Sequence, residues 1–130
     1  MIVVDASIVV TALADDGQDG DRARQRIRDE RLTAPHLIDI EVISAWRRLV
    51  TQGALDDRRA HLAMTDLLAL RLDRVPHGPL LERCWELREN LTVYDGAYVA
   101  LAEILQVTLL TGDSRIEQAP GPHCPIEVLA

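Results

Sequence analysis

The chain begins Met1-Ile2-Val3-Val4-Asp5-Ala6-Ser7, a short apolar run that is closed by an aspartate. Runs of this length that are rich in β-branched residues are typical of strands buried in a parallel sheet. In open parallel sheets, ligands bind just beyond the carboxyl ends of the strands. Asp5 is therefore expected at the edge of the sheet where a functional site would lie.

Strands and helices alternate along the rest of the chain. Further strands are predicted at 32–34, 72–75, 107–110 and 126–129, and helices at 7–14, 19–30, 36–51, 56–70, 79–90, 94–105 and 114–118. Such alternation gives right-handed crossovers and a parallel sheet that is covered on both faces. We therefore predict an α/β protein, a three-layer α/β/α sandwich around a central parallel sheet.

Length and composition restrict the class of protein. The 130 residues suit a single domain, 1–130, and the apolar stretches are far shorter than the roughly 20 residues that cross a bilayer. No basic segment precedes an apolar core at the start, as it would in a signal peptide. We expect a cytoplasmic protein with no membrane contact, in which Cys84 and Cys124 are reduced thiols.

The net charge of −7 argues against a polyanionic partner, because nucleic-acid affinity comes largely from neutralised phosphates. The objection is weakened because all fourteen basic residues are arginines, and five of them lie within 22–31. Cations bound by the acids would also cancel part of the charge. The arginine stretch is either a solvated helix face paired with Asp21, Asp29 and Glu30, or an edge that contacts phosphates.

Four acids stand at comparable places and are the candidate functional residues. Asp5 and Asp113 each follow a predicted strand, so both lie at the carboxyl edge of the sheet. Glu41 lies on or beside the apolar stripe of its helix, and Asp95 begins a helix with its side chain toward the sheet. All four can therefore converge at one edge of one sheet.

Each acid also has a local explanation. Helix capping alone could explain Asp5, Asp95 and Asp113, because each stands at or near a predicted helix start. Glu41 faces inward, where an unpartnered carboxylate costs several kcal/mol on the order given for buried polar groups. An ion pair with Arg47 or Arg48 could compensate it, although both arginines point to other sides of the same helix.

Convergence of the four acids has an electrostatic consequence. Two carboxylates about 4 Å apart repel by roughly 4 kcal/mol at an effective dielectric near 20, so four unpaired neighbours would not all stay ionised. A hard divalent cation removes this conflict, and a set of ligands that are all oxygens selects Mg²⁺ or Mn²⁺. Such a cation supports hydrolysis of a phosphodiester.

Other chemistries need residues that this chain lacks. A P-loop nucleotidase needs GxxxxGK[ST], and the sequence contains no lysine. The chain has no Gly-x-Ser-x-Gly nucleophile elbow, and its four histidines form no HExxH pair. P-loop nucleotidases, α/β-hydrolases and HExxH metalloproteases are therefore excluded.

Four stretches, in this order and spacing, carry a resemblance to a known family: Ile2-Val3-Val4-Asp5-Ala6-Ser7, Glu41 after Ala34-Pro35-His36-Leu37, Tyr94-Asp95-Gly96-Ala97-Tyr98-Val99-Ala100-Leu101-Ala102, and Leu109-Leu110-Thr111-Gly112-Asp113. The chain resembles a PIN-domain ribonuclease of the VapC type, the toxin of a bacterial toxin–antitoxin pair. The resemblance covers essentially all 130 residues. It implies a parallel sheet of about five strands, Mg²⁺- or Mn²⁺-dependent endonucleolytic cleavage of RNA, a homodimer, and inhibition by a small cognate antitoxin.

The resemblance also assigns roles to single residues. It implies a catalytic, metal-binding quartet made of Asp5, Glu41, Asp95 and Asp113, with Asp5 and Asp95 as the direct ligands. Ser7 and Thr111 match hydroxyl positions beside the quartet, where they would hydrogen-bond a ligand acid or the scissile phosphate. Gly96 replaces an expected alanine or other small residue, which loosens the helix start but removes no ligand.

A different class of protein would use the same edge without catalysis. In a non-catalytic PIN-like module, the acids would receive the arginines of a bound partner peptide. A complete quartet argues against this alternative, because a decayed site should have lost at least one acid. Titration with Mg²⁺ or Mn²⁺, followed by thermal melting, distinguishes the two.

Overall fold

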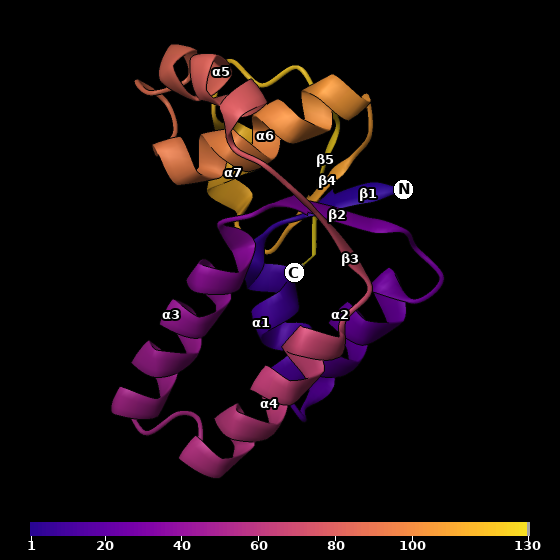
Figure 1. Ribbon diagram of the computed structural model, residues 1–130, viewed down its shortest axis with the longest axis vertical. Helices are drawn as coiled ribbons and strands as arrows, with labels where there is room; N and C mark the ends of the chain where they lie inside the picture. Colours follow the sequence, from indigo (N-terminus) through magenta and orange to yellow (C-terminus); the bar gives the residue numbers. More distant parts are fainter. Residues whose placement is uncertain (130) are drawn as a thin grey trace.

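Five parallel strands form the centre of the molecule, and helices cover both faces of this sheet (Figure 1). The computed structural model describes residues 1–129. Its elements in chain order are β1 (Ile2–Val4), α1 (Ala6–Ala14), α2 (Gln18–Ile27), β2 (Leu32–Pro35), α3 (Ile38–Thr51), α4 (Asp57–Ala69), β3 (Leu72–Val75), the 3₁₀ turn η1 (Gly78–Leu80), α5 (Leu81–Glu86), α6 (Val93–Leu105), β4 (Leu109–Thr111), α7 (Ser114–Gln118) and β5 (Ile126–Val128). This arrangement confirms the predicted α/β/α sandwich.

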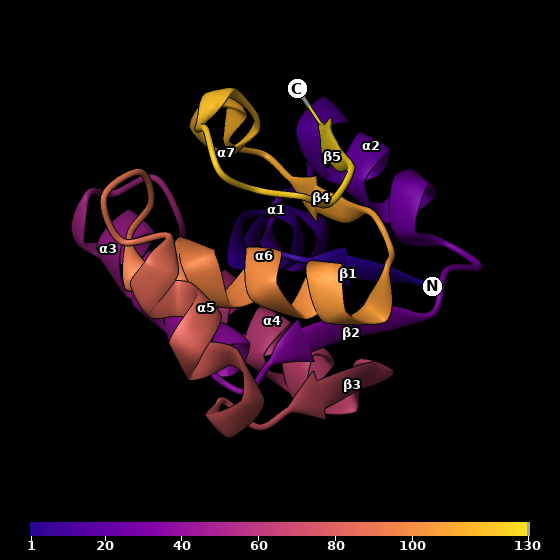
Figure 2. The same cartoon turned by 90° about the horizontal axis from the view of Figure 1, so that it is seen from above.

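The order of the strands locates the functional edge. The sheet runs β3-β2-β1-β4-β5, with Val3 of β1 paired to Thr33 on one side and to Leu109 on the other (Figure 2). The chain thus builds outward from β1 to β3 and then returns to place β4 against the free side of β1. All the strands are parallel, but the side on which successive strands are added changes between β1 and β4. Open parallel sheets bind ligands in the crevice beyond such a switch point.

Each face of the sheet has its own set of helices. Helices α1 to α4 lie on one face, whereas α5 and α6 lie on the other (Figures 1 and 2). Residues 96–102 of α6 are all buried, because this helix is held between the sheet and α5. A helix that is apolar around its whole circumference is typical of such a buried position.

Helix α2 packs very closely on the end of α1. A Cβ atom on the buried Gly20 would lie 1.8 Å from the carbonyl oxygen of Asp15, so no other residue fits there without moving the backbone. The Arg24 guanidinium donates to the carbonyl oxygens of Ala12 (2.9 Å) and Asp15 (2.8 Å). These donors satisfy carbonyl groups that the end of α1 leaves without a helical partner.

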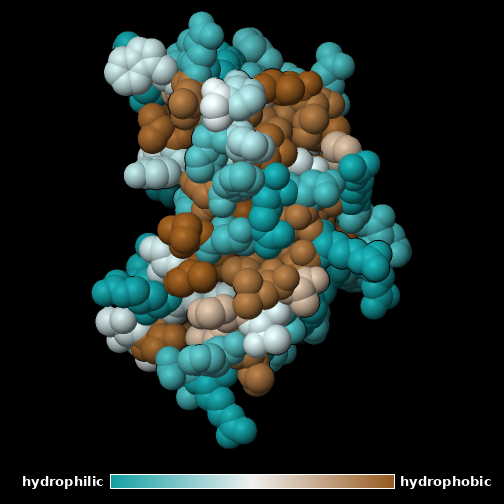
Figure 3. All heavy atoms as spheres, in the orientation of Figure 1, coloured by the Kyte–Doolittle hydropathy of each residue, from teal (hydrophilic) through white to brown (hydrophobic). Residues whose placement is uncertain are grey.

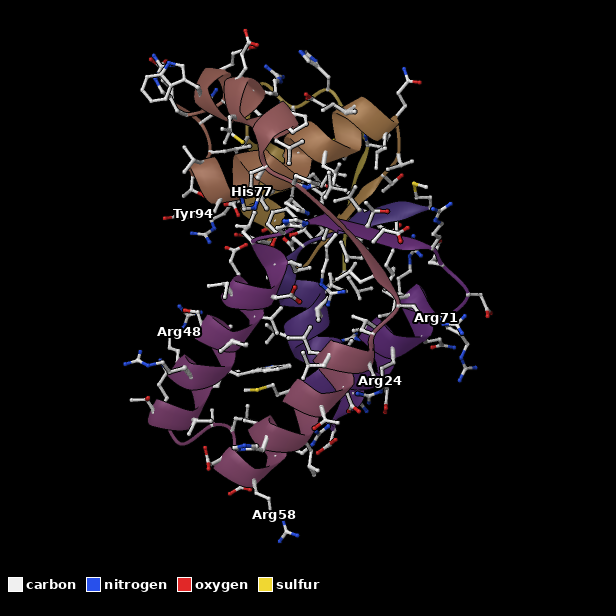
Figure 4. The ribbon with its side chains drawn as sticks, in the orientation of Figure 1. Arg24, Arg48, Arg58, Arg71, His77 and Tyr94 are labelled. Atoms are coloured by element: carbon white, nitrogen blue, oxygen red, sulfur yellow. The ribbon has the colours of Figure 1, made fainter. Side chains whose placement is uncertain are left out.

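Acids engage most of the arginine stretch. Arg24 pairs with Asp21 at 2.6 Å, and Arg26 binds Glu127 through two bonds of 2.7 and 2.9 Å. Figure 4 places Arg24 on the side of the molecule away from Tyr94, which lies at the start of α6. These pairs favour the interpretation as a solvated, ion-paired helix face.

Three helices differ from the prediction by two or more residues. Helix α2 ends at Ile27 rather than at Glu30, because the chain leaves the helical conformation after Ile27 and Asp29 adopts a positive φ of 63°. The helix predicted at 79–90 is a 3₁₀ turn followed by α5, which ends at Glu86. Beyond Glu86 the chain forms 3₁₀-type hydrogen bonds to the third residue back, such as Arg88 N–H to the Trp85 carbonyl (3.2 Å). Helix α3 begins at Ile38 rather than His36, because the His36 amide donates to the Val75 carbonyl (2.9 Å) beside β3. Within residues 1–129, no helix is both long and apolar enough to span a bilayer.

Candidate functional site

The four candidate acids come from four elements that meet at the switch point. Asp5 follows β1, Asp113 follows β4, Glu41 lies in the first turn of α3, and Asp95 lies in the first turn of α6. Burial is the main cause of the raised pKa values of Asp5, Glu41 and Asp95, and the charges of the acids add to it: Asp95 acts on Asp5 and Glu41, and Asp113 acts on Asp95. The fold therefore brings the four carboxyls into one electrostatic cluster.

Asp5 is the most buried of the four, with 5% of its surface exposed. Its carboxylate accepts hydrogen bonds from the Ser7 amide (3.0 Å) and from the hydroxyls of Ser7 and Thr111. Burial raises the pKa of Asp5, although these hydrogen bonds oppose the rise. Asp5 does cap α1, but an ordinary cap at a helix start is exposed to water, so capping does not explain this burial.

The two hydroxyls also join the ends of β1 and β4. The Ser7 hydroxyl accepts a hydrogen bond from the Gly112 amide (2.9 Å), and the Thr111 hydroxyl accepts one from the Asp113 amide (3.0 Å). A Cβ atom on Gly112 would lie 3.1 Å from the Ser7 Oγ, which makes this approach tight for any larger residue. The orientation of Asp5 is therefore fixed by the loop that carries Asp113.

Glu41 is held by a residue of the opposite helix layer. The hydroxyl of Tyr98, on α6, donates to Glu41 Oε1 at 2.6 Å. Burial raises the pKa of Glu41; the bond from Tyr98 opposes this rise, and the charges of Asp95 and Asp5 add to it. The partner of Glu41 is therefore Tyr98, and the interpretation as an ion pair with Arg47 or Arg48 is wrong. The sequence contained one signal for this contact, since a tyrosine on the buried face of a helix needs a partner for its hydroxyl.

The start of α3 is fixed from β3, and this positions Glu41. Arg74 binds Asp39 through two parallel hydrogen bonds of 2.6 and 2.9 Å. His77 accepts a hydrogen bond at Nε2 from the Leu37 amide (2.9 Å). Bidentate guanidinium–carboxylate pairs restrict orientation as well as distance. Sequence reasoning missed both contacts, because neither Asp39 nor His77 stands out from its neighbours.

The pKa values of Asp95 and Asp113 are shifted in opposite directions. Burial is the main cause of the raised pKa of Asp95, whose amide is capped by Thr92 Oγ1 (3.1 Å). Asp113 caps α7 and is clasped by the exposed Arg115 guanidinium at 2.7 Å, and this contact lowers the pKa of Asp113. The Gly96 amide bonds the Thr92 carbonyl (2.9 Å), so α6 runs without a break past Asp95.

The donors of the site suit a hard cation that keeps part of its water. Every candidate ligand atom is an oxygen, which favours Mg²⁺ or Mn²⁺ over softer metals. Within residues 1–129, no three or more His, Cys, Asp or Glu side chains are grouped to hold an ion between them. Mg²⁺ typically takes only one or two carboxylates and completes its shell with water and substrate, so Asp5 with Asp95 fits this requirement.

Comparison with known proteins identifies the family. The model of the PIN domain matches residues 2–122. A VapC ribonuclease of Mycobacterium bovis is 47% identical over 132 residues, covering 99% of this chain and 98% of its own length. Ribonuclease VapC1 of Mycobacterium tuberculosis is 45% identical, covering 98% and 96%. A toxin–antitoxin complex from Klebsiella pneumoniae shares the fold, with a TM-score of 0.67 at 15% identity and coverage of 100% and 98%. The chain belongs to the PIN domain family and, within it, to the VapC ribonucleases.

Proposed function

We propose that this protein cleaves RNA as a Mg²⁺- or Mn²⁺-dependent endonuclease, with Asp5, Glu41, Asp95 and Asp113 as its catalytic acids. The observation that carries the proposal is the buried Asp5 carboxyl beside two half-buried carboxyls at the switch point, with raised pKa values. A positive charge placed among these carboxyls would offset the burial and the mutual repulsion that raise their pKa values. The full-length relatives are named ribonucleases, which supports RNA as the substrate.

The residues of the site have separate proposed roles in binding the metal, holding Asp5 and moving a proton. Asp5 and Asp95 are the proposed direct ligands, and a bound cation would lower the pKa of a water and neutralise phosphate charge. Ser7 and Thr111 keep the Asp5 carboxylate in one orientation. Glu41, with its raised pKa, is suited to accept the proton of the attacking water.

The first test is dependence on the metal. Purified protein is expected to cut total RNA with Mg²⁺ or Mn²⁺ and to lose this activity with excess EDTA. Because a ligand that binds only the folded state stabilises it, either metal should also raise the melting temperature. The matched control is Asp66→Asn, which removes an exposed carboxyl from α4 and should leave both results unchanged. Equal cleavage with and without EDTA would contradict the proposal.

Tyr98→Phe is expected to shift the pH dependence of cleavage. Removal of the hydroxyl takes away the hydrogen bond that lowers the pKa of Glu41, so the acid limb of the pH–rate profile should move to higher pH. The unfolding free energy should fall by about 1–3 kcal/mol, as for other buried acceptors left without a donor. Denaturant melts and pH–rate profiles measure the two effects. Tyr94→Phe makes the same change on an exposed residue one turn away, and an equal shift there would refute the role of Tyr98.

We also infer that the protein is the toxin of a toxin–antitoxin pair, that residues 1–130 act as one domain in the cytoplasm, and that two copies associate. A toxin–antitoxin complex among the structures with this fold supports a small antitoxin as partner. Apolar side chains remain exposed on α3 and α4, notably Ile40, Leu62 and Leu68 at 71%, 57% and 82%. Figure 3 shows apolar surface over the lower part of the molecule, where these two helices lie. They supply a surface for a second chain, and light scattering of the purified protein measures the oligomeric state.

A further inference from the structure

Two of the few aromatic side chains are exposed, and one of them adjoins the site. The chain has two tryptophans, two tyrosines and no phenylalanine. Trp46 and Tyr98 are buried, whereas Trp85 and Tyr94 are 64% and 60% exposed. Tyr94 directly precedes Asp95 in the first turn of α6. A large ring that stays in water at this position is available for a ligand of the site.

The helix geometry fixes where Tyr94 lies relative to the acids. Tyr94 and Tyr98 are four residues apart, so they occupy the same face of α6 about one turn, or 5.4 Å, from each other. Tyr98 reaches Glu41 with its hydroxyl at 2.6 Å. Tyr94 therefore stands one turn outside the contact with Glu41, at the rim where the space-filling view is hollowed between the helices above and below the sheet (Figures 3 and 4).

We propose that Tyr94 is a stacking platform for an unpaired base of bound RNA. The inference rests on the proposed function and narrows its substrate to RNA that is single-stranded where it meets the rim. Tyr94 stands one helical turn from Tyr98, the residue whose hydroxyl contacts Glu41. A base next to a phosphate held at the acids could therefore reach Tyr94, and aromatic side chains hold splayed bases by stacking. A paired base offers no free face, since its neighbours in the duplex cover it.

The charges around the rim suit such a neutral contact. The chain carries a net charge of −7, so phosphate contacts alone provide a weak attraction for RNA. The expectation that Arg48 points to another side of the helix than Glu41 is wrong, because seven residues make almost two full turns and return Arg48 to the Glu41 side of α3. Its exposed side chain lies at the outer edge of α3 in Figure 4. Stacking on Tyr94 and one phosphate contact along α3 would together hold a strand that leaves the site.

The test measures binding separately from cleavage. The probe is a single-stranded oligoribonucleotide of mixed sequence with 2-aminopurine at successive positions, titrated in EDTA so that no metal-dependent chemistry proceeds. Wild-type protein and Tyr94→Phe are expected to bind and to quench the fluorescence of one or two positions, because stacking quenches this base. Tyr94→Leu should lose the quenching and raise the dissociation constant about 5- to 150-fold, the range for loss of one stacked base.

The controls separate stacking from other causes. Trp85→Leu removes the other exposed aromatic ring, on α5, and should leave binding unchanged. The same oligonucleotide annealed to its complement should bind Tyr94→Leu and wild type alike. Quenching by Tyr94→Leu equal to that of wild type would overturn the stacking role. Failure of the wild-type protein to cut RNA with Mg²⁺ or Mn²⁺ would instead overturn the proposed function, and cleavage is measured in a separate reaction.

Discussion

Asp5→Asn is expected to abolish RNA cleavage, with turnover falling by at least about 100-fold. Mutating a residue that only hydrogen-bonds a metal ligand costs up to about 100-fold, and Asp5 is the proposed ligand itself. The amide keeps the size and one acceptor oxygen of the side chain, but it carries no charge for a cation. The hydroxyls of Ser7 and Thr111 can rotate to suit the amide, so the surrounding geometry should survive. Single-turnover cleavage of total RNA measures the effect.

The stability of the same variant separates catalysis from folding. Burial raises the pKa of Asp5 in the folded state, so the wild-type protein gains stability as the pH falls through this pKa and loses it as the pH rises. The amide side chain of the variant cannot ionise. Asp5→Asn should therefore melt at or above the wild-type temperature at neutral pH, with the difference shrinking in acid. An inactive variant that also melts lower at neutral pH would indicate that Asp5 is mainly structural.

Gly20→Ala should cause the largest loss of stability among the glycine-to-alanine substitutions in this chain. The new Cβ would lie 1.8 Å from the Asp15 carbonyl oxygen, a backbone atom that cannot rotate away. Helix α2 would have to move from α1 and strain the bonds of Arg24. We expect a loss of about 3 kcal/mol or more, which lowers the melting temperature by about 10 °C or more.

The matched control is Gly78→Ala at the start of η1. A Cβ atom on Gly78 would have no neighbour within 4 Å, so the substitution should change stability by less than about 0.5 kcal/mol. Denaturant unfolding of both variants measures the difference. Similar values for the two glycines would show that α2 does not pack on α1 as closely as described.

Local pattern was enough to predict the sheet and the position of Asp5. The apolar run before Asp5 is buried on both faces of β1. Strands buried in this way are recognisable in a sequence as continuous apolar runs. The bond between Tyr98 and Glu41 could not be predicted in this way, because it joins residues 57 positions apart. It depends on how α3 and α6 approach from opposite layers of the sheet. The early end of α5 likewise depends on local bonding after Glu86.

The site joins the two halves of the chain, so it is completed late in synthesis. Strand β1 pairs with β4, whose residues follow it by more than a hundred positions. A nascent chain that ends before α6 has only Asp5 and Glu41, and the side of β1 that will receive β4 is still unpaired. Such long-range closure is slow relative to local helix formation. A ribosome that is making this nuclease therefore carries an incomplete chain without a working site until the last third of the protein has been made.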